Sequence, residues 1–489
     1  MTESLLEPGA EPEDRSLREG TGSGRANLEL FIVGLGALAV SMSQTMLAPA
    51  LGQLNELYGV NANWLLTAPL LVAAVCVPVL GRLGDMFGKR LMLLVALAAL
   101  TVGSLIDALT SDIGWLIAGR AVQGISSAAV PLGISLVATL MPRHKAASAV
   151  AVISAMLGVG GALAMPLAGL IAENWDWHLL SWTTAVAGAI AFPLVLLFVP
   201  ESLQRDGGRV DVPGTILLSI GLVSLILPLE QSHDWGWTSP GVLGLLIVSA
   251  ATFAIFVAVE TRTREPLVDI TALRRRPIAT TNLASVCFGF ALFASFIGTS
   301  TFVEAGRWTG YGLEASLVAG GMTMLPSGLM MLIFSPLAAK LIPRWGAPRT
   351  MALGAFIVAA GWLLRIVLSD SLWQVMLGTT ITGIGTGFGY ATIPTLINLH
   401  TPPHEIAAAN GLNTLFRNLG STLATSIGTA ILTSSLVYHV VDGEVVGAAS
   451  SFTAYRWLFA VCAVAALVAG LLVLTIPSGI AAQRGRARA

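Results

Sequence analysis

The sequence predicts an all-α integral membrane protein with fourteen spanning helices. Of its 489 residues, 55% are apolar and only 11% are charged, about half the charged share of an average soluble domain. The chain also contains fourteen mostly apolar runs. Each is close to or above the roughly 20 residues that a helix needs to cross a hydrocarbon core about 30 Å thick.

The order of these runs defines the predicted spans. They cover residues 29–51, 63–83, 90–110, 113–141, 147–171, 178–199, 212–231, 240–260, 278–303, 315–341, 349–369, 372–398, 405–437 and 454–477. Residues 1–27 lack the apolar core of a cleaved signal peptide and are expected to form a disordered cytoplasmic tail. Residues 479–489 are expected to form a short basic cytoplasmic tail.

The basic residues of the connections predict the orientation. Fifteen arginines and lysines fall on one side of the membrane, whereas the other side keeps Arg307 and Arg456. The positive-inside rule assigns the richer side to the cytoplasm. We therefore expect a multi-pass protein of the cell (inner) membrane, in contact with the lipid bilayer and with both termini in the cytoplasm.

Composition argues against several classes of function. The net charge is −1, so there is no basic excess to attract nucleic acid. The three cysteines and six histidines are dispersed, which gives neither a metal set nor a catalytic constellation. A phosphate loop of the GxxxxGK[ST] type is missing. We expect no enzyme activity, no metal and no cofactor.

An internal repeat predicts a duplicated bundle. Residues 78–90 align with residues 336–348 at a separation of 258, and residues 119–126 align with residues 378–385 one residue further out. The expected units are an N-terminal six-helix bundle at 28–200, a linker with two inserted helices at 201–277, and a C-terminal six-helix bundle at 278–478. Two such halves are typical of an alternating-access carrier with its site near the midplane.

Residues 81–90 (GRLGDMFGKR) carry the most specific motif. They resemble the loop between the second and third helices of the major facilitator superfamily, and the rest of the chain resembles the fourteen-helix drug:proton antiporter branch of that family. The resemblance implies a gate at the cytoplasmic mouth, in which glycines permit a tight turn and Asp85 meets the N-terminal end of a helix from the other half. The implied gate residues are Gly81, Leu83, Asp85, Gly88, Lys89 and Arg90.

Two further segments resemble family motifs. Arg120, followed by Gln123, matches the fourth-helix motif that the family links to proton movement; a structural pairing of Arg120 with Asp107 is the alternative. The fifth span resembles the antiporter motif of exporters, in which small residues and a proline suit a moving helix interface. The motif residues are Gly158, Gly161, Pro166 and Gly169, with Met165 and Leu170 where the family usually has Gly.

The thirteenth span contains the strongest candidate for a transport site. Arg417 would lie about 18 Å inside the span, near the midplane, with Asn410 and Asn413 as hydrogen-bond donors nearby. A structural pairing of Arg417 with backbone carbonyls is the alternative. In the first span, Ser43 stands where the family usually has Asp, which leaves Gln44 as the nearby polar group. Glu304, at the outer end of the ninth span, stands where members of the resembled family tend to have Gln. It suits a protonatable group in an outward-open vestibule, and a carboxylate that snorkels to the interface is the alternative.

Together these features predict a proton-coupled exporter of small, largely apolar organic compounds, acting as a monomer on protons and a small-molecule substrate. Arginine and amide side chains outnumber carboxylates in the predicted cavity. We therefore expect a neutral, zwitterionic or anionic substrate. An importer or lipid transporter of the same fold is the alternative, and a membrane receptor or enzyme is a third class.

Overall fold

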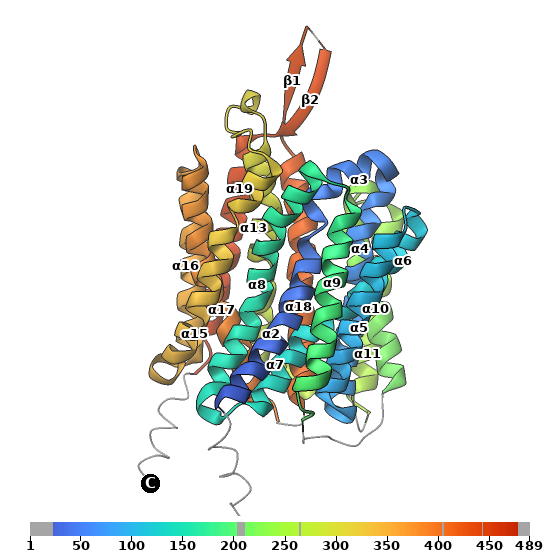
Figure 1. The fold of residues 1–489 in the computed structure, drawn as a ribbon, viewed down its shortest axis with the longest axis vertical. Helices are drawn as coiled ribbons and strands as arrows, with labels where there is room; N and C mark the ends of the chain where they lie inside the picture. Colours follow the sequence, from blue (N-terminus) through green and yellow to red (C-terminus); the bar gives the residue numbers. More distant parts are fainter. Residues whose placement is uncertain (1–22, 203–210, 264–265, 403–404, 443, 478–489) are drawn as a thin grey trace, which may run out of the picture.

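The computed structural model describes residues 23–202, 211–263, 266–402, 405–442 and 444–477. Nearly all of these residues are helical, and the long helices run side by side (Figure 1). One two-stranded hairpin projects beyond the ends of the helices. We call this end the hairpin face and the opposite end, where α2 begins and α19 ends, the terminal face.

The first half extends from α2 to α9. Its elements are α2 Ser23–Thr45, η1 Ala48–Ala50, α3 Leu51–Tyr58, η2 Gly59–Asn63, α4 Trp64–Phe87, α5 Lys89–Leu109, α6 Ile113–Ile125, η3 Ser126–Ala128, α7 Ala129–Leu140, α8 Arg143–Asn174 and α9 His178–Phe198.

Two helices follow and then the second half. The inserted pair is α10 Val212–Trp235 and α11 Pro240–Glu260. The later elements are α12 Ile270–Arg274, α13 Arg276–Glu304, η4 Arg307–Thr309, α14 Leu317–Met322, α15 Leu325–Trp345, α16 Ala347–Val367, α17 Leu372–His400, α18 Ile406–Thr433, β1 Leu436–Val441, β2 Glu444–Ser450 and α19 Phe452–Leu474.

The two halves repeat one packing pattern. In the first half, α2 packs on α8, α4 on α6, and α5 on α9; in the second, α13 packs on α18, α15 on α17, and α16 on α19. Each helix of the first half therefore has a counterpart with equivalent neighbours. This is the duplicated arrangement that the repeat at a separation of 258 predicts, and it divides the fold into two six-helix bundles with two additional helices.

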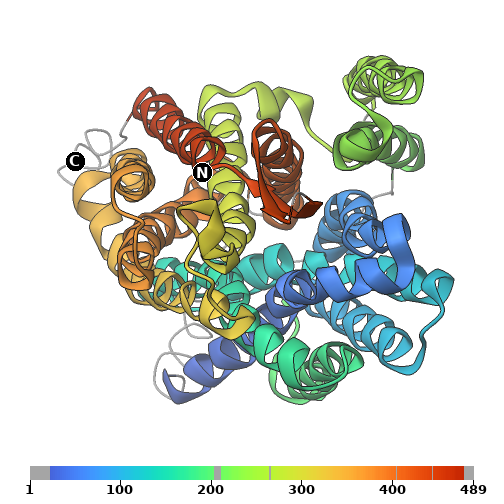
Figure 2. The same cartoon turned by 90° about the horizontal axis from the view of Figure 1, so that it is seen from above.

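The bundles meet along two seams. At the terminal face α4 contacts α18, and towards the hairpin face α8 contacts α14 and α15. The duplication relates these seams, because α4 corresponds to α15 and α8 corresponds to α18. The inserted helices α10 and α11 pack on each other, and α10 also touches α4 and α18. Figure 2 shows this pair, in green, at the edge of the molecule.

Twelve helices among the described residues are both long and apolar enough to cross a membrane. The two remaining long helices, α17 with 29 residues and α18 with 28, are each about 42 Å long or more but more polar. Asn410, Asn413 and Arg417 lower the hydropathy of α18, and all three side chains are buried. The count of fourteen spans stays a prediction, in which α17 and α18 cross as interior helices.

The structure corrects two local expectations. The connection between the second and third predicted spans is shorter than the expected residues 84–89, because α4 continues to Phe87 and α5 begins at Lys89. Only Gly88 forms the turn, with φ 126°, a conformation that favours glycine. The thirteenth span also ends earlier than predicted, at Thr433 instead of residue 437, because the chain enters β1.

The hairpin itself escaped sequence analysis. Strands β1 and β2 pair antiparallel, with an irregularity between His439 and Val440. The Tyr311 phenol donates to the carbonyl of Ser450 at 2.5 Å, and burial raises the pKa of Tyr311, so the phenol keeps its proton. Trp308 stacks on His439 with ring centroids 4.9 Å apart. These contacts fix the hairpin to the connection that follows α13.

Candidate functional site: the cleft between the halves

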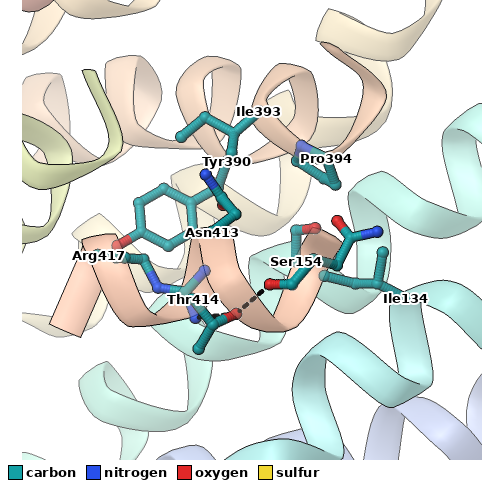
Figure 3. Close-up of a pocket in the computed structure, with 9 residues that line it drawn as sticks. Ile134, Ser154, Tyr390, Ile393, Pro394, Asn413, Thr414 and Arg417 are labelled. Carbon is teal, nitrogen blue, oxygen red and sulfur yellow. Dashed lines mark hydrogen bonds between the residues drawn. The ribbon is translucent and has the colours of Figure 1, made fainter. Parts of the chain in front are cut away.

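A small cavity lies between the two halves, with a volume of about 10 Å³, enough for about one water molecule. Helices α7 and α8 supply Ile134 and Ser154, whereas α17 and α18 supply the other lining residues (Figure 3). Those others are Tyr390, Ile393, Pro394, Asn410, Asn413, Thr414 and Arg417. The cavity is smaller than the roughly 300–1,000 Å³ of pockets that hold drug-sized ligands. A substrate of that size therefore needs the halves to move apart.

Arg417 is the charged residue among those that line this cavity. It is 8% exposed, and its guanidinium carbon lies 5.4 Å from the ring centroid of Tyr390. Nη2 donates to the Thr414 hydroxyl at 3.4 Å. A desolvated contact of this cation–π type stabilises by about 2 kcal/mol. Within the described residues no carboxylate forms an ion pair with Arg417.

The two asparagines on the same helix are bonded within the second half. Asn410 Nδ2 donates to Asn398 Oδ1 at 2.7 Å and to the carbonyl of Ile406 at 2.8 Å. Asn413 Nδ2 donates to Asn282 Oδ1 and to Ser285 Oγ, each at 2.8 Å. Their amide nitrogens therefore hold α18 to α17 and α13, and both side chains border the cavity next to Arg417.

Asp85 connects the halves at the terminal face. Its carboxylate is buried and accepts hydrogen bonds from the backbone N–H groups of Ala407 and Ala408, at 3.3 and 2.9 Å. These N–H groups begin α18, where the helix dipole favours a negative charge. Lys89 lies 3.6 Å from the same carboxylate and is also buried. At the terminal-face seam, the Asp85 carboxylate of the first half thus binds the N-terminal end of α18 of the second half, and Lys89 balances its charge.

The other residues of segment 81–90 support this contact. A Cβ on Gly81 would lie 2.9 Å from the carbonyl oxygen of Ala407, so glycine permits close approach of α4 and α18 here. Leu83 packs on the apolar cluster beside Asp85. Glu201 accepts from the backbone N–H of Arg90 at 2.9 Å and lies against Gly88. The Arg90 guanidinium donates to the carbonyl of Leu196.

Small residues of α8 form the hairpin-face seam. Gly158 lies against Met331, and Gly161 lies against the ring of Phe296. A Cβ on Gly169 would lie 2.7 Å from the carbonyl carbon of Leu317, and one on Gly321 would lie 2.6 Å from Cα of Pro166. Met165, which stands where the family usually has Gly, is buried against Gly321. The glycine on the partner helix provides the close approach instead.

Comparison with known proteins identifies the fold. A family model described as Major Facilitator Superfamily matches residues 33–425 and, in a second match, residues 315–487. The chain belongs to the major facilitator superfamily. Among solved structures, this facilitator is similar to the human organic anion transporter MFSD10 (TETRAN), with a TM-score of 0.64 and 16% identity over 92% of this chain and 99% of the other. That similarity shows the fold alone.

Several curated relatives of this facilitator have names that refer to drug resistance. Multidrug resistance protein Stp of Mycobacterium tuberculosis is 28% identical over 417 residues, covering 84% of this chain and 75% of the relative. Multidrug resistance protein 3 of Bacillus subtilis is 26% identical, covering 82% and 79%. Puromycin resistance protein pur8 of Streptomyces alboniger is 27% identical over 459 residues, covering 91% and 89%.

In the first half of this facilitator, Arg120, Gln123 and Asp107 form one buried network. Arg120 Nη1 donates to Gln123 Oε1 at 2.5 Å, and Gln123 Nε2 donates to Asp107 Oδ2 at 2.7 Å. Arg120 also donates to the carbonyls of Leu65 and Ser43, at 2.9 and 3.3 Å. Gln123 therefore bridges the arginine and the aspartate, which are not a direct ion pair, while Asp107 Oδ1 is buried without a partner.

The remaining predicted site residues lie apart from the cavity. Ser43 donates to Gln123 Oε1 at 3.0 Å and so belongs to the network of the first half. Gln44 is exposed and donates to the Ser127 hydroxyl at 3.4 Å. Glu304 ends α13 at the hairpin face and lies against Gly320. The structure thus separates the predicted residues into the group around Arg417, the Asp107–Gln123–Arg120 network, Gln44 beside Ser127, and Glu304 at the hairpin face.

Sequence analysis missed Arg365, a fully buried arginine near the end of α16. Its guanidinium carbon lies 4.9 Å from the centroid of the Trp362 ring and 4.3 Å from that of Phe459. Nη1 donates to Thr299 Oγ1 at 2.9 Å, whereas Nε and Nη2 are buried without partners. The sequence signal that could have revealed Arg365 is its position as a charged residue inside the apolar run 349–369. Among the described residues no acidic, histidine and cysteine cluster could hold a metal ion.

Proposed function

We propose that this facilitator exports small, largely apolar organic compounds across the bacterial inner membrane, driven by the proton gradient. The observation that carries the proposal is the small cavity around Arg417. It lies between two duplicated bundles and is closed on each side by a seam of close helix contacts. A closed central site between related halves is the arrangement that alternating access requires.

The proposed direction of transport is outward. Support comes from the antiporter-like residues Gly158, Gly161, Pro166 and Gly169, all of which face the second half. It also comes from the relatives whose names refer to multidrug and puromycin resistance. Small residues allow helices to pack closely in a membrane, where no hydrophobic force drives them together.

The proposed orientation places the terminal face in the cytoplasm. Lys340, Arg344 and Arg349 lie around the connection between α15 and α16, at the terminal face. The positive-inside rule favours the cytoplasm for such basic connections. We propose a monomer with units at 28–200, 201–277 and 278–478. Residues 1–22 and 479–489 of the predicted tails lie outside the described residues, whereas residues 23–27, predicted to be disordered, belong to α2.

The proposed substrate is neutral, zwitterionic or anionic. Arg417 supplies the charge among the lining residues of the cavity, and the lining residues include no acid. In the first half, Ser43 stands in place of the usual carboxylate and bonds to Gln123. A permanent cation would therefore meet a buried guanidinium without a carboxylate to balance it.

The proposed proton pathway uses a buried and a half-buried ionisable group outside this cavity. Asp107, held by Gln123 beside Arg120, is one candidate, and Glu304 at the hairpin face is another. Ionisable groups within membrane spans are costly and usually functional. Keeping them apart from Arg417 allows proton and substrate to bind at different places.

Inverted vesicles that contain the full chain and a pH dye test the proposal. Adding an exported compound from a panel of neutral, anionic and cationic drugs is expected to release protons from the acidified lumen. Arg417→Ala should lower this response about tenfold or more, and Arg417→Lys should retain part of it because the positive charge stays. Proton release by none of the compounds, or an unchanged response in Arg417→Ala, would contradict the proposal.

Transport in the opposite direction or of a lipid is the second candidate, and the family fold favours it over a receptor or an enzyme. Compound uptake by cells that contain the chain, without proton flux in vesicles, would support import. Movement of a labelled lipid between leaflets would support lipid transport. Binding without passage would support a receptor.

A further inference from the structure

The guanidinium of Arg417 has more hydrogen-bond donors than the protein uses. A guanidinium carries five N–H groups. Within the part of the chain that the structure describes, its hydrogen-bond acceptor is Thr414 Oγ1, 3.4 Å from Nη2. The ring of Tyr390 lies against the same head group, with its centroid 5.4 Å from the guanidinium carbon. Among the described residues, Nε and Nη1 of Arg417 are therefore left without an acceptor, and the charge is left without a carboxylate.

A second buried arginine, Arg365, shows a different arrangement. Arg365 is fully buried against Trp362 and Phe459, and its unused nitrogens, Nε and Nη2, are enclosed by protein. The unused nitrogens of Arg417 are not enclosed in this way, and Arg417 lines the cavity. The free donors of Arg417 thus face a space that a ligand can enter, whereas those of Arg365 do not.

The other polar side chains of the cavity use their donors within the protein. The amides of Asn410 and Asn413 donate to partners on α13, α17 and α18. The hydroxyls of Thr414 and Ser154 donate to backbone carbonyls of their own helices, each at 2.9 Å. Among the described lining residues, the donors left for a ligand are the guanidinium N–H groups and the phenol of Tyr390. Both kinds of donor suit an oxyanion.

Helix α13 fixes the position of Arg417. A Cβ on Gly289 would overlap the carbonyl oxygen of Arg417 and would lie 3.1 Å from its Cγ. The backbone and the first part of the arginine side chain are therefore held against α13, and Tyr390 holds the head group. Donors that are already in place lose little freedom when a ligand binds, so the arrangement favours binding.

The chemistry of the cavity selects the charge of the ligand. A buried cation without a counter-ion is costly, and a ligand carboxylate supplies both the missing charge and the planar pair of oxygens that a guanidinium binds best. A neutral ligand would leave the charge uncompensated, and a cation would add to it. The apolar residues Ile134, Ile393 and Pro394 line the rest of the cavity and suit an apolar body.

We propose that the substrate is an organic acid in its anionic form, whose carboxylate binds the free N–H groups of Arg417 while its apolar body lies against Ile393 and Pro394. The assignment narrows the substrate of the export proposed above and rests on that function. An anion that leaves a negatively charged cytoplasm and a proton that enters it both move in the direction that the membrane potential favours. The potential therefore adds to the driving force for export of such an anion.

Equilibrium binding to the purified full chain in lipid nanodiscs tests the charge of the ligand. The probes are naphthylacetate and cyclohexylacetate, each compared with its methyl ester and with the amine of the same ring. Binding to empty nanodiscs is subtracted. Near neutral pH both acids are ionised, and each should bind about tenfold or more tightly than its ester, because the charge-assisted bonds to Arg417 are missing from the ester. The amines should bind more weakly still.

Three variants assign the preference to Arg417. Arg417→Gln keeps a polar side chain without the charge and should abolish the difference between acid and ester. Arg417→Lys should keep the preference at lower affinity, because an ammonium does not form the paired bonds of a guanidinium. Arg365→Lys changes the other buried arginine, whose free donors are enclosed, and should bind all probes as the unmodified chain does.

The outcomes separate the substrate assignment from the proposed function. Acids that bind no more tightly than their esters, binding of none of the probes, or an acid preference that survives in Arg417→Gln would overturn the assignment. Proton flux in vesicles driven by an ester and not by its acid would also overturn it, while export itself would stand. Acid preference that depends on Arg417, without proton flux from any compound, would support the anion site and overturn proton-coupled export instead.

Discussion

Arg365 occupies the place in the second half that Asp107 occupies in the first. The two residues are 258 positions apart, the separation of the internal repeat, and they lie on the corresponding helices α16 and α5. Both side chains are buried. Asp107 bonds to Gln123, whereas Arg365 lies between two aromatic rings and has no carboxylate partner among the described ion pairs. The duplicated position thus carries opposite charges in two different environments.

Arg365→Met is expected to leave the stability unchanged or to raise it by about 1–3 kcal/mol. Methionine fills much of the same volume and removes a buried charge that lacks a counter-ion. Arg365→Ala should instead lower stability by about 3 kcal/mol, because it leaves a cavity between Trp362 and Phe459. Denaturation of the two variants in detergent measures the difference. Equal losses in both would show that the guanidinium itself stabilises the fold.

Asp107→Asn distinguishes the two roles that remain open for the network of the first half. Asparagine keeps an acceptor for Gln123 but cannot exchange a proton, so stability should change by less than about 1 kcal/mol while compound-driven proton flux falls. Asp107→Leu leaves Gln123 Nε2 without its acceptor and should cost about 1–3 kcal/mol. Unfolding curves and vesicle assays on the same preparations report both effects. Unchanged proton flux in Asp107→Asn would show that Asp107 has only a structural role and does not carry the proton.

Gly321→Val should abolish transport while the protein still inserts into the membrane. A Cβ at this position overlaps the backbone at Met165 and Pro166, so the hairpin-face seam cannot close; overpacking of this kind costs about 1–3 kcal/mol. Gly244→Ala on α11 is the matched control, because nothing lies within 4 Å of an added Cβ there. Transport assays with quantified membrane protein check the pair. Full activity in Gly321→Val would show that the seam does not need to close.

Asp85→Asn should open the terminal face in part, and Asp85→Ala should open it further. Asparagine keeps one acceptor oxygen for Ala407 and Ala408 but loses the charge that suits a helix N-terminus, and the full loss of such a cap costs about 1 kcal/mol. Spin labels at Phe87 and Trp345, both exposed at this face, measure the distance between the halves. Glu56→Gln, on exposed α3, is the control. Identical distances in all four proteins would exclude Asp85 from closing this end.

Hydropathy and the repeat predicted most of the fold because a membrane span needs a long apolar run, and such a run is visible in one sequence. Most of the observed helices begin and end within a few residues of the predicted spans, and the duplication reappears as equivalent helix pairs. The exception is α2, Ser23–Thr45, which begins and ends six residues before the predicted span 29–51. Hydropathy described α17 and α18 less well, since interior helices that border a cleft contain polar residues. The hairpin of β1 and β2 was missed because its short strands lie outside the spans.

For the site, the sequence predicted individual residues on one helix but not the contacts between residues on different helices. Arg417, Asn410 and Asn413 share one helix, so their spacing placed them together near the cavity. Contacts between distant segments could not be predicted from local patterns, because they depend on how the helices pack. Examples are the hydrogen bonds by which Gln123 links Arg120 to Asp107, and the hydrogen bond from Val318 to Glu173. Arg365 could have been found by applying the separation of 258 residues to Asp107.

The most direct test of alternating access measures both ends of the cleft under the same conditions. Spin-label pairs at Phe87 and Trp345 on the terminal face, and at Leu57 and Trp373 on the hairpin face, follow the distance between the halves during a change from pH 5 to pH 9. The two distances should change in opposite directions, one lengthening as the other shortens. If both lengthen together, or if neither changes in protein that still transports, the two halves do not rock about a central cleft.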